Sequence, residues 1–338
     1  MSDMIPRNSL LGQQSWQKEL ADVITDPVEL LKMLAINPED YFDDIKARQL
    51  FPVRVPRPFA DRIEKGNPRD PLLLQVMPKA QEFLKSPGYV TDPLQEQQTV
   101  APGMLHKYES RVLFILKGGC AVNCRYCFRR HFPYAETKIN KRDIQVSLEY
   151  LEQHPEINEV ILSGGDPLMA NDDFLQWMLE KLEAIPHLTR IRIHTRLPVV
   201  IPARITQKLL TVLSSSRLQA LIVLHINHAN EIDGALKQAC KDIREAGIHL
   251  LNQSVLLKDV NDTKEALINL SEALFEAGVM PYYLHLLDKV EGAEHFDISE
   301  TEAVELVQSI TKKLPGFLVP RLAREEPGKP SKTLININ

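Results

Sequence analysis

The chain has 338 residues, of which 44% are apolar and 25% charged, so it is long enough for one large globular domain or two smaller ones. Its 40 basic and 45 acidic residues give a net charge of −5, which argues against a protein that coats nucleic acid or an anionic membrane. No apolar run approaches the roughly 20 residues that cross a bilayer, and the N-terminus shows no signal-peptide pattern, so we expect a cytoplasmic protein.

Residues 1–108 have an irregular pattern that predicts a wrapping region. Two short helical patterns, Trp16–Val23 and Pro27–Leu34, precede proline-rich connectors such as Phe51–Pro58. Proline removes a backbone donor and fixes φ, so such segments run over a surface instead of joining a central sheet. We therefore expect a mainly helical N-terminal extension that packs around another domain.

From residue 109 to residue 314, short β-branched runs alternate with amphipathic helical patterns. The predicted strands are Val112–Leu116, Glu159–Ser163, Arg190–Thr195, Ala220–Ile226, His249–Leu257 and Val279–Leu287. The predicted helices are Lys141–His154, Asp172–Ile185, Ile205–Ser214, Gly234–Ala246, Lys264–Ala277 and Glu300–Leu314. Strand starts recur about every 30 residues, which is the length of one strand and its crossover helix. These βα units predict a parallel α/β sheet, curled into a partial (β/α)6 barrel or, as the second choice, open and doubly wound.

Polar and ionisable residues follow most of the predicted strands. In both candidate folds, ligands bind at the carboxyl ends of the strands, which meet on one rim. The stretches at these ends are Lys117–Cys120, Ser163–Leu168, His194–Arg196, His225–Asn227 and His285–Asp288. The sequence therefore predicts one ligand site on this rim.

Three cysteines directly after the first predicted strand indicate a metal centre. Cys120, Cys124 and Cys127 have the spacing C-x3-C-x2-C, and the fourth cysteine, Cys240, falls inside an amphipathic helix as a small buried residue. Structural zinc normally takes four ligands, often as paired C-x2-C knuckles, and no second pair exists here. An iron–sulfur cubane held by three cysteines leaves one iron open. The loop resembles that of the radical S-adenosylmethionine superfamily, including the aromatic Tyr126.

This resemblance implies a [4Fe-4S] cluster whose open iron binds S-adenosylmethionine and cleaves it reductively to a 5′-deoxyadenosyl radical. The superfamily also has a glycine-rich strand end that holds the amino group of S-adenosylmethionine. Gly164, Gly165 and Asp166 match it, directly after the second predicted strand. Glycines allow close backbone approach to a ligand, whereas Asp166 is open to a structural interpretation as well.

A segment near the C-terminus gives a narrower resemblance. Residues Val319–Lys332, together with the cysteine loop and stretches such as Thr195–Val200 and Glu291–Phe296, are similar to the lysine 2,3-aminomutase family over about residues 50–334. In that family a lysine near the C-terminus holds pyridoxal 5′-phosphate. Lys332 falls at that position, Lys329 three residues earlier is the alternative, and the family's glycine run is missing. Residues 315–338 are thus predicted as a cofactor-lysine segment.

The family positions also assign substrate-binding residues. Arg129 matches the arginine that binds the substrate carboxylate, which suits a guanidinium fork. Asp288 and Glu325 match two acids that bind the distal ammonium of lysine, although the second is usually aspartate. Arg130 is interpreted as a surface charge.

Three further residues are candidate neighbours of the cofactors. They are His194 and Arg196 on the third predicted strand and Tyr108 before the first. For His194, a hydrogen-bonded histidine of the core is the alternative interpretation.

The resemblance implies an isomerase that converts L-α-lysine to β-lysine by abstracting hydrogen from C3 and moving the amino group from C2 to C3. Within the family, the chain is most similar to the branch that supplies β-lysine for modification of elongation factor P. The expected partners are lysine, an electron donor such as flavodoxin or ferredoxin, and a functional link to an elongation factor P ligase. Nucleic acid and membrane are not expected as partners.

Three other functions stay open. The first is a catabolic or osmolyte-producing aminomutase that acts on lysine or another amino acid. The second is a non-catalytic iron–sulfur or zinc protein that scaffolds a modification complex. The third is a radical enzyme without pyridoxal phosphate, such as a methylthiotransferase, which the absence of further cysteine pairs disfavours.

Overall fold

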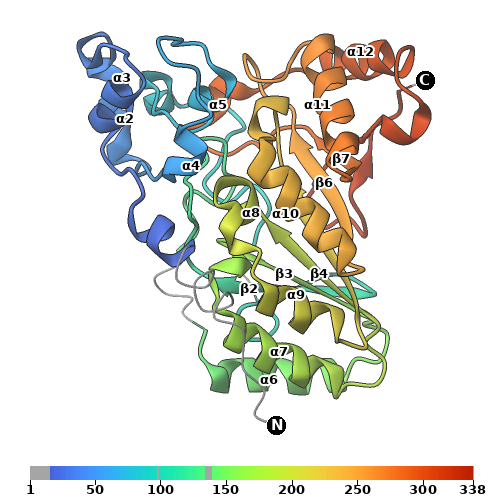
Figure 1. Ribbon diagram of the computed structural model, residues 1–338. Coiled ribbons are helices and arrows are strands. Elements are labelled where there is room, and N and C mark those ends of the chain that lie inside the picture. Colours follow the sequence, from blue (N-terminus) through green and yellow to red (C-terminus); the bar gives the residue numbers. More distant parts are fainter. Residues whose placement is uncertain (1–15, 97–98, 134–138, 338) are drawn as a thin grey trace.

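The computed structural model describes residues 16–96, 99–133 and 139–337, and within these residues one mixed sheet of nine strands follows the chain order from β1 to β9 (Figure 1). The strands are β1 Met104–Tyr108, β2 Arg111–Lys117, β3 Glu159–Gly164, β4 Arg190–Thr195, β5 Gln219–His225, β6 His249–Val255, β7 Met280–His285, β8 Arg321–Arg324 and β9 Thr333–Leu334. Neighbours from β2 to β8 pair in parallel, whereas β1 and β9 add antiparallel strands at the two edges.

The crossovers between parallel strands carry the long helices. These are α6 Lys141–Glu152, α7 Asp172–Glu183, α9 Gln207–Ser214, α10 Gly234–Glu245, α11 Lys264–Glu276 and α12 Glu300–Thr311. Each begins after a side-chain cap that accepts a backbone N–H of the first turn: Asn140, Asn171, Thr206, Asp233, Thr263 and Ser299. The caps occupy some of the donors that a helix start leaves without a partner, so they set where each helix begins.

The predicted βα alternation is confirmed, and the doubly wound alternative is excluded. A doubly wound sheet reverses its strand order at a switch point, whereas this sheet runs in sequence from β1 to β9. The strands β1, β8 and β9 escaped prediction because they are short and their sequences hold few apolar residues in alternation. The parallel strand β8 follows the sixth βα unit and pairs Tyr283 with Arg321.

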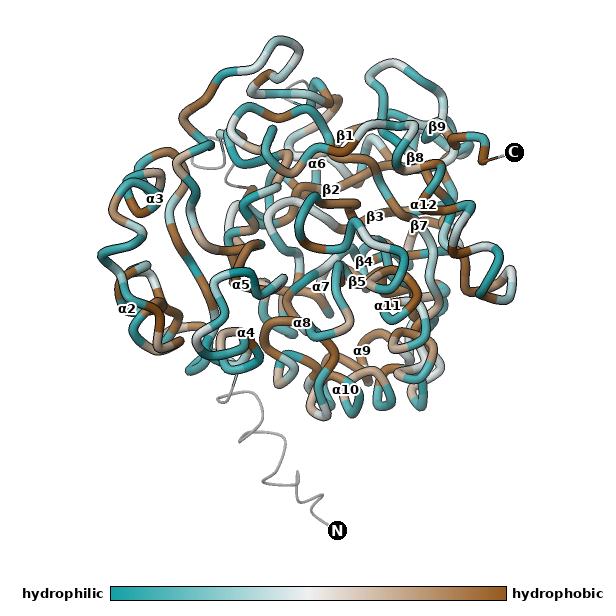
Figure 2. The backbone as a smooth tube through the Cα atoms, turned by 90° about the horizontal axis from the view of Figure 1, so that it is seen from above, coloured by the Kyte–Doolittle hydropathy of each residue, from teal (hydrophilic) through white to brown (hydrophobic). Residues whose placement is uncertain are grey.

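The strands alternate between an outer apolar face and an inner polar face. In β4, Ile191 and Ile193 are buried in the hydrophobic core, whereas Arg192 and His194 line an interior cavity. This alternation follows from the two-residue period of a strand. Figure 2 shows hydrophobic stretches gathered in the interior and hydrophilic stretches at the outer loops and helix surfaces.

Residues 16–96 form a layer against α8 Leu197–Val200 and the 3-10 turn Ala229–Glu231, at the side of the barrel (Figure 1). The layer contains α2 Pro27–Met33, α3 Phe42–Lys46, α4 Arg57–Ala60 and α5 Pro71–Leu74, with short 3-10 turns at Pro38–Tyr41, Ala47–Gln49 and Ala80–Phe83. Residues 16–21 are also helical, at the first predicted helix. Apolar residues of this layer belong to the same core cluster as those of the barrel, so the packing is continuous.

Within the described residues, no helix is long and apolar enough to cross a membrane.

Candidate active site

The inner face of the sheet surrounds a cavity of about 600 Å³. Its walls include residues from the ends of β2, β3, β4, β5 and β7 and from the segment after β8. The predicted metal, cofactor and substrate residues all line it: Cys120, Cys124, Cys127, Arg129, Gly164, Gly165, Asp166, His194, Arg196, Asp288, Glu325 and Lys332. Residues more than 200 positions apart in the sequence thus meet in one place.

The cysteine loop leaves the carboxyl end of β2 and turns back on itself, with the N–H of Cys127 donating to the carbonyl of Cys124 at 3.0 Å. Burial, together with the neighbouring thiol Cys124, raises the pKa of Cys127 to about 11. Burial and the nearby Cys127 likewise raise the pKa of Cys120 well above its usual value. Thiolate is the metal-binding form, so these groups need a positive partner to ionise.

The donor set of this loop fits an iron–sulfur cluster. In the described part of the chain, no three His, Cys, Asp or Glu side chains converge as a single-ion site would require. Three soft thiols on one loop at the cavity wall match a cluster that takes its ligands on separate irons. Cys240 is buried in α10, as expected, and takes no part in the cavity.

The glycine turn after β3 packs directly on the cysteine loop. The N–H of Gly165 donates to the carbonyl of Lys117 at 2.7 Å, and the N–H of Asp166 donates to the carbonyl of Gly119 at 2.9 Å. Gly164 has φ +122°, and a Cβ there would lie 2.7 Å from the carbonyl oxygen of Lys117. A Cβ on Gly165 would collide with the backbone of Gly119. The glycines are therefore required for the contact between two backbones.

Asp166 holds the backbone next to the cavity in place through its side-chain hydrogen bonds. Its two oxygens accept hydrogen bonds from the hydroxyl of Thr195 and from the backbone N–H groups of Leu168, Arg196 and Leu197, at 2.7–3.0 Å. The protein's own donors thus occupy this buried carboxylate. The structural interpretation of Asp166 therefore has the stronger support, since the side chain fixes the start of α8.

Arg196 connects the cysteine loop to a buried polar network. One terminal nitrogen donates to Cys124 Sγ at 2.9 Å, and the other donates to Gln75 Oε1 at 2.8 Å and Glu231 Oε2 at 3.0 Å. Burial alone would lower the pKa of Arg196, but Cys124 and Glu231 offset this effect and raise it. Gln75 and Glu231 escaped sequence analysis because each is an isolated polar residue outside any motif.

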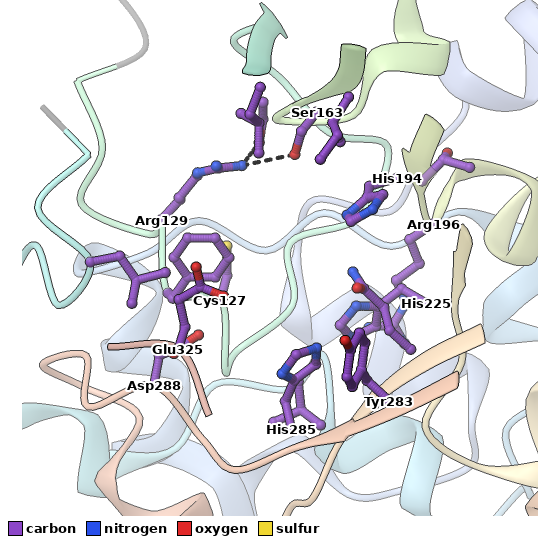
Figure 3. A pocket seen from close by; sticks show the side chains of 18 of the residues that line it. Cys127, Arg129, Ser163, His194, Arg196, His225, Tyr283, His285, Asp288 and Glu325 are labelled. Atoms are coloured by element: carbon purple, nitrogen blue, oxygen red, sulfur yellow. Dashed lines mark hydrogen bonds between the residues drawn. The ribbon is translucent and has the colours of Figure 1, made fainter. Parts of the chain in front are cut away.

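Arg129 is buried, and its guanidinium is held on two sides. Its Nε donates to Glu96 Oε2 at 2.6 Å, while a terminal nitrogen donates to Ser163 Oγ at 3.1 Å and the carbonyl of Gly164 at 3.0 Å (Figure 3). Glu96 also accepts from Lys107 at 2.8 Å. Burial would raise the pKa of Glu96, but the two cations outweigh burial and hold that pKa below its usual range. Glu96 is a site residue that the sequence did not indicate.

The two predicted acids lie beside Lys332. The Lys332 amino group and the Tyr108 hydroxyl both donate to Glu325. Burial raises the pKa of Asp288 to about 7, against the opposing effect of the Lys332 charge. At Glu325 the effect of burial is overcome by Lys332 and the two hydrogen bonds, so the pKa is lowered. Glu325 thus forms an ion pair with the Lys332 ammonium group, whose charge also acts on Asp288.

Three histidines form part of the opposite wall. In the view of Figure 3, Asp288, Glu325, Cys127 and Arg129 lie on one side and His194, Arg196, His225, Tyr283 and His285 on the other. Burial lowers the pKa of all three histidines, that of His225 to about 3, so they are neutral near pH 7. Nε2 of His194 and Nε2 of His225 have no hydrogen-bond partner among the described residues.

Cations suited to a phosphate group line the cavity. Arg111, Arg192 and Lys107 all line it, and the guanidinium of Arg111 lies 4.2 Å from the ring centre of Tyr108. A lysine amine together with arginines for a phosphate is the donor set that pyridoxal 5′-phosphate requires. Lys329, by contrast, is exposed and is not part of the cavity wall.

The interpretation of Arg130 as a surface charge is wrong. Its side chain is 0% exposed, because it pairs with the equally buried Glu82. The sequence gave no sign that Arg130 is buried, since its carboxylate partner Glu82 lies 48 residues away in the irregular N-terminal region.

The curled parallel sheet and the cysteine loop after its first parallel strand define a radical S-adenosylmethionine protein. The family model described as "Radical SAM superfamily" matches residues 114–270. Membership in this superfamily implies a [4Fe-4S] cluster and S-adenosylmethionine as cofactors. The crystal structure of a radical SAM methyltransferase from Sphaerobacter thermophilus superposes with a TM-score of 0.47 at 14% identity, covering 65% of this chain and 68% of that one.

Curated relatives define the family more narrowly. The chain is 58% identical to the L-lysine 2,3-aminomutase of Escherichia coli (strain K12), over 96% of both proteins. It is 55% identical to the Haemophilus influenzae protein of the same name, over 98% of both. It is 31% identical to the Clostridium subterminale protein of that name, over 96% of this chain and 78% of that protein. The chain belongs to the L-lysine 2,3-aminomutase family, which confirms the family resemblance found in its sequence.

Proposed function

We propose that this protein is an isomerase that converts L-α-lysine to β-lysine with a [4Fe-4S] cluster, S-adenosylmethionine and pyridoxal 5′-phosphate. One observation carries the proposal: the three cysteines line the same cavity as Arg129, Asp288, Glu325 and Lys332, the residues that the family positions assign to substrate and cofactor. When bound, the cofactors supply a carbon radical that can take an unactivated hydrogen and a π bond to the migrating nitrogen.

The ends of the cavity fit the two ends of lysine. Arg129 binds the α-carboxylate, since its fork is already oriented by Glu96 and Ser163. Asp288 and Glu325 bind the distal ammonium. The ion pair between Lys332 and Glu325 supports this assignment, because it shows that an ammonium group is accommodated there. The substrate ammonium replaces the Lys332 amine at the acids once that amine holds the cofactor.

The remaining polar groups orient the cofactors. Cys120, Cys124 and Cys127 hold the cluster, and Arg196 orients Cys124 by donating a hydrogen bond to its Sγ. Arg111 and Lys107 supply positive charge for the phosphate of the cofactor on Lys332.

Lysine deuterated at C3 tests the reaction. The protein is reconstituted anaerobically with all three cofactors and a reductant, and mass spectrometry follows β-lysine and the label in 5′-deoxyadenosine. Formation of β-lysine together with label transfer is the expected result. If protein that is shown to hold both the cluster and pyridoxal phosphate forms neither product, the activity on free lysine is refuted.

Lys332 and Lys329 offer a matched pair of variants. We expect Lys332→Ala to abolish formation of β-lysine and the visible absorbance of bound pyridoxal phosphate. Lys329→Ala, on the exposed turn, should retain both. The opposite pattern would show that Lys329 holds the cofactor.

The proposed physiological role is supply of β-lysine for modification of elongation factor P, with flavodoxin or ferredoxin as electron donor. Its support is the resemblance of the chain to the branch of the family that supplies β-lysine for this modification. The intact mass of elongation factor P from cells that lack this gene should show no β-lysyl group, and added β-lysine should restore it. An unchanged mass would favour the catabolic or osmolyte-producing alternative.

A further inference from the structure

The N-terminal layer contacts the cysteine loop through its backbone. The N–H of Asn123 donates to the carbonyl of Arg54 at 3.0 Å, and its side-chain amide donates to the carbonyl of Pro52 at 2.9 Å. The N–H of Arg125 donates to the carbonyl of Gln75 at 2.9 Å. The loop that carries the three cysteines is therefore held from outside the barrel.

Glu82 provides the charged part of this contact. Its side chain is fully buried, and its carboxylate accepts hydrogen bonds from Arg125 Nε at 2.8 Å and from a terminal nitrogen of Arg130 at 2.5 Å. Arg125 directly follows Cys124, and Arg130 lies three residues after Cys127. One carboxylate thus connects residues on both sides of Cys127.

The guanidiniums of Arg125 and Arg130 make further contacts besides those with Glu82. Both lie over the ring of Phe51, at 5.2 and 5.1 Å from its centre, and the carbonyl of Phe51 accepts from Arg125 at 2.7 Å. Arg130 also donates to the carbonyl of Gly292 at 2.7 Å, close to Asp288 in the chain. These contacts join the N-terminal layer, the cysteine loop and the segment after β7.

The charges of Glu82, Arg125 and Arg130 do not cancel. Two buried guanidiniums face one carboxylate, which leaves net positive charge next to the cysteines. A cluster with three thiolate ligands is negatively charged, so nearby cations stabilise it and favour its reduced form. Glu82 both fixes the position of these cations and limits their effect.

We propose that Glu82, in the N-terminal layer, is a positioning residue for the iron–sulfur cluster, and this proposal rests on the cluster-binding part of the proposed function. Through Arg125 and Arg130 it holds the cysteine loop in the shape that accepts the cluster. The N-terminal layer is then part of the redox site although it supplies no ligand.

The test compares Glu82→Gln with wild type after anaerobic reconstitution of the full-length chain. The measurements are iron and sulfide per chain, the electron paramagnetic resonance spectrum of the reduced cluster, and its reduction potential. We expect Glu82→Gln to hold less than half of the wild-type iron, with the remaining cluster shifted to a more positive potential. Glu82→Asp should restore part of the iron content. Asp43→Asn, at an exposed ion pair of the same layer, is the control and should match wild type.

A structural role alone gives a different pattern. If Glu82→Gln only lowers the melting temperature while iron content, spectrum and potential match wild type, the proposal is overturned. If Glu82→Gln does not fold, Arg130→Lys takes its place, since it retains the charge but cannot bridge Glu82 and Gly292. Full iron content and an unchanged spectrum in Arg130→Lys would also overturn the proposal. Wild type that binds its cluster but forms no β-lysine would refute the proposed function and leave this proposal intact.

Discussion

Glu325 has one methylene more than the aspartate usual at this family position, and Tyr108 holds its longer side chain in place. The Tyr108 hydroxyl donates to one carboxylate oxygen and the Lys332 amine to the other. A hydrogen bond to a charged group contributes about 1.5–3 kcal/mol. The length of the acid and the reach of the tyrosine therefore act together at the proposed binding site for the substrate ammonium.

Tyr108→Phe tests this coupling. Removal of the hydroxyl should raise the KM for lysine about tenfold and change kcat less, because the bond orients a binding group and not a reacting atom. Steady-state kinetics at saturating S-adenosylmethionine give both values. Tyr89→Phe is the matched control, since Tyr89 donates to Asp297 outside the cavity wall and should leave the KM for lysine unchanged.

The pKa of Asp288 predicts a dependence on pH. Burial raises that pKa to about 7, with Lys332, Glu325, Glu96 and Lys107 as the charged groups that act on it. As the pH falls from 8 to 6 the carboxylate takes up a proton and loses its attraction for the substrate ammonium. The value of kcat/KM, which reports on the free enzyme, should therefore fall with an apparent pKa near 7.

Asp288→Asn should remove this limb of the pH profile and lower kcat/KM at pH 8 toward the acid value of wild type. A variant that retains the same limb would assign the titration to another group.

The pKa of Asp288 also determines how this residue affects the stability of the folded protein as the pH changes. Because the folded state raises the pKa of this carboxyl group, Asp288 makes unfolding easier as the pH rises from about 4 to about 7.

The residues that could be predicted are those whose spacing or family position carries information. Cys120, Cys124 and Cys127 sit in a fixed spacing, and Lys332 lies at a definite distance from Val319. Glu96, Gln75 and Glu82 could not be found in this way, since single polar residues in an irregular segment show no period and their partners are distant in sequence. Their roles become visible only in the folded structure, where each buried carboxylate or amide has specific hydrogen-bond partners.

At the level of elements, the contact between the cysteine loop and the glycine turn sets the geometry of the cluster site. Gly165→Ala should separate the two loops, because the new Cβ would collide with the backbone of Gly119. We expect a loss of about 1–3 kcal/mol of stability and at least tenfold weaker binding of S-adenosylmethionine to the reconstituted protein. Equilibrium dialysis and thermal unfolding measure the two effects.

Gly234→Ala is the control for this substitution. It lies in the first turn of α10, where a Cβ meets nothing within 4 Å, so both quantities should stay at wild-type values. Wild-type binding in Gly165→Ala would show that the loops can move apart without effect on the cofactor.

Strong periodicity also explains which elements could be predicted. The helices of 8–13 residues and the apolar parallel strands were located within a few residues of their bounds. The strand β8 was missed because its four residues, Arg321–Arg324, contain only two buried side chains. It joins the sheet through its pairing with β7, which is a tertiary interaction that a local pattern cannot show.

For the whole molecule, the shared core predicts that the N-terminal layer and the barrel unfold together. Phe59 of α4 is fully buried, and the guanidinium of Arg196 lies 5.6 Å from its ring centre, so this residue connects the layer to the site. Phe59→Ala should cost about 3–5 kcal/mol and lower the midpoint of a single unfolding transition. Phe42→Ala, at a side chain 69% exposed, should leave the midpoint nearly unchanged. Hydrogen exchange should show amides of the layer and of β4 losing protection together in Phe59→Ala, and two separate transitions would show that the layer folds independently of the barrel.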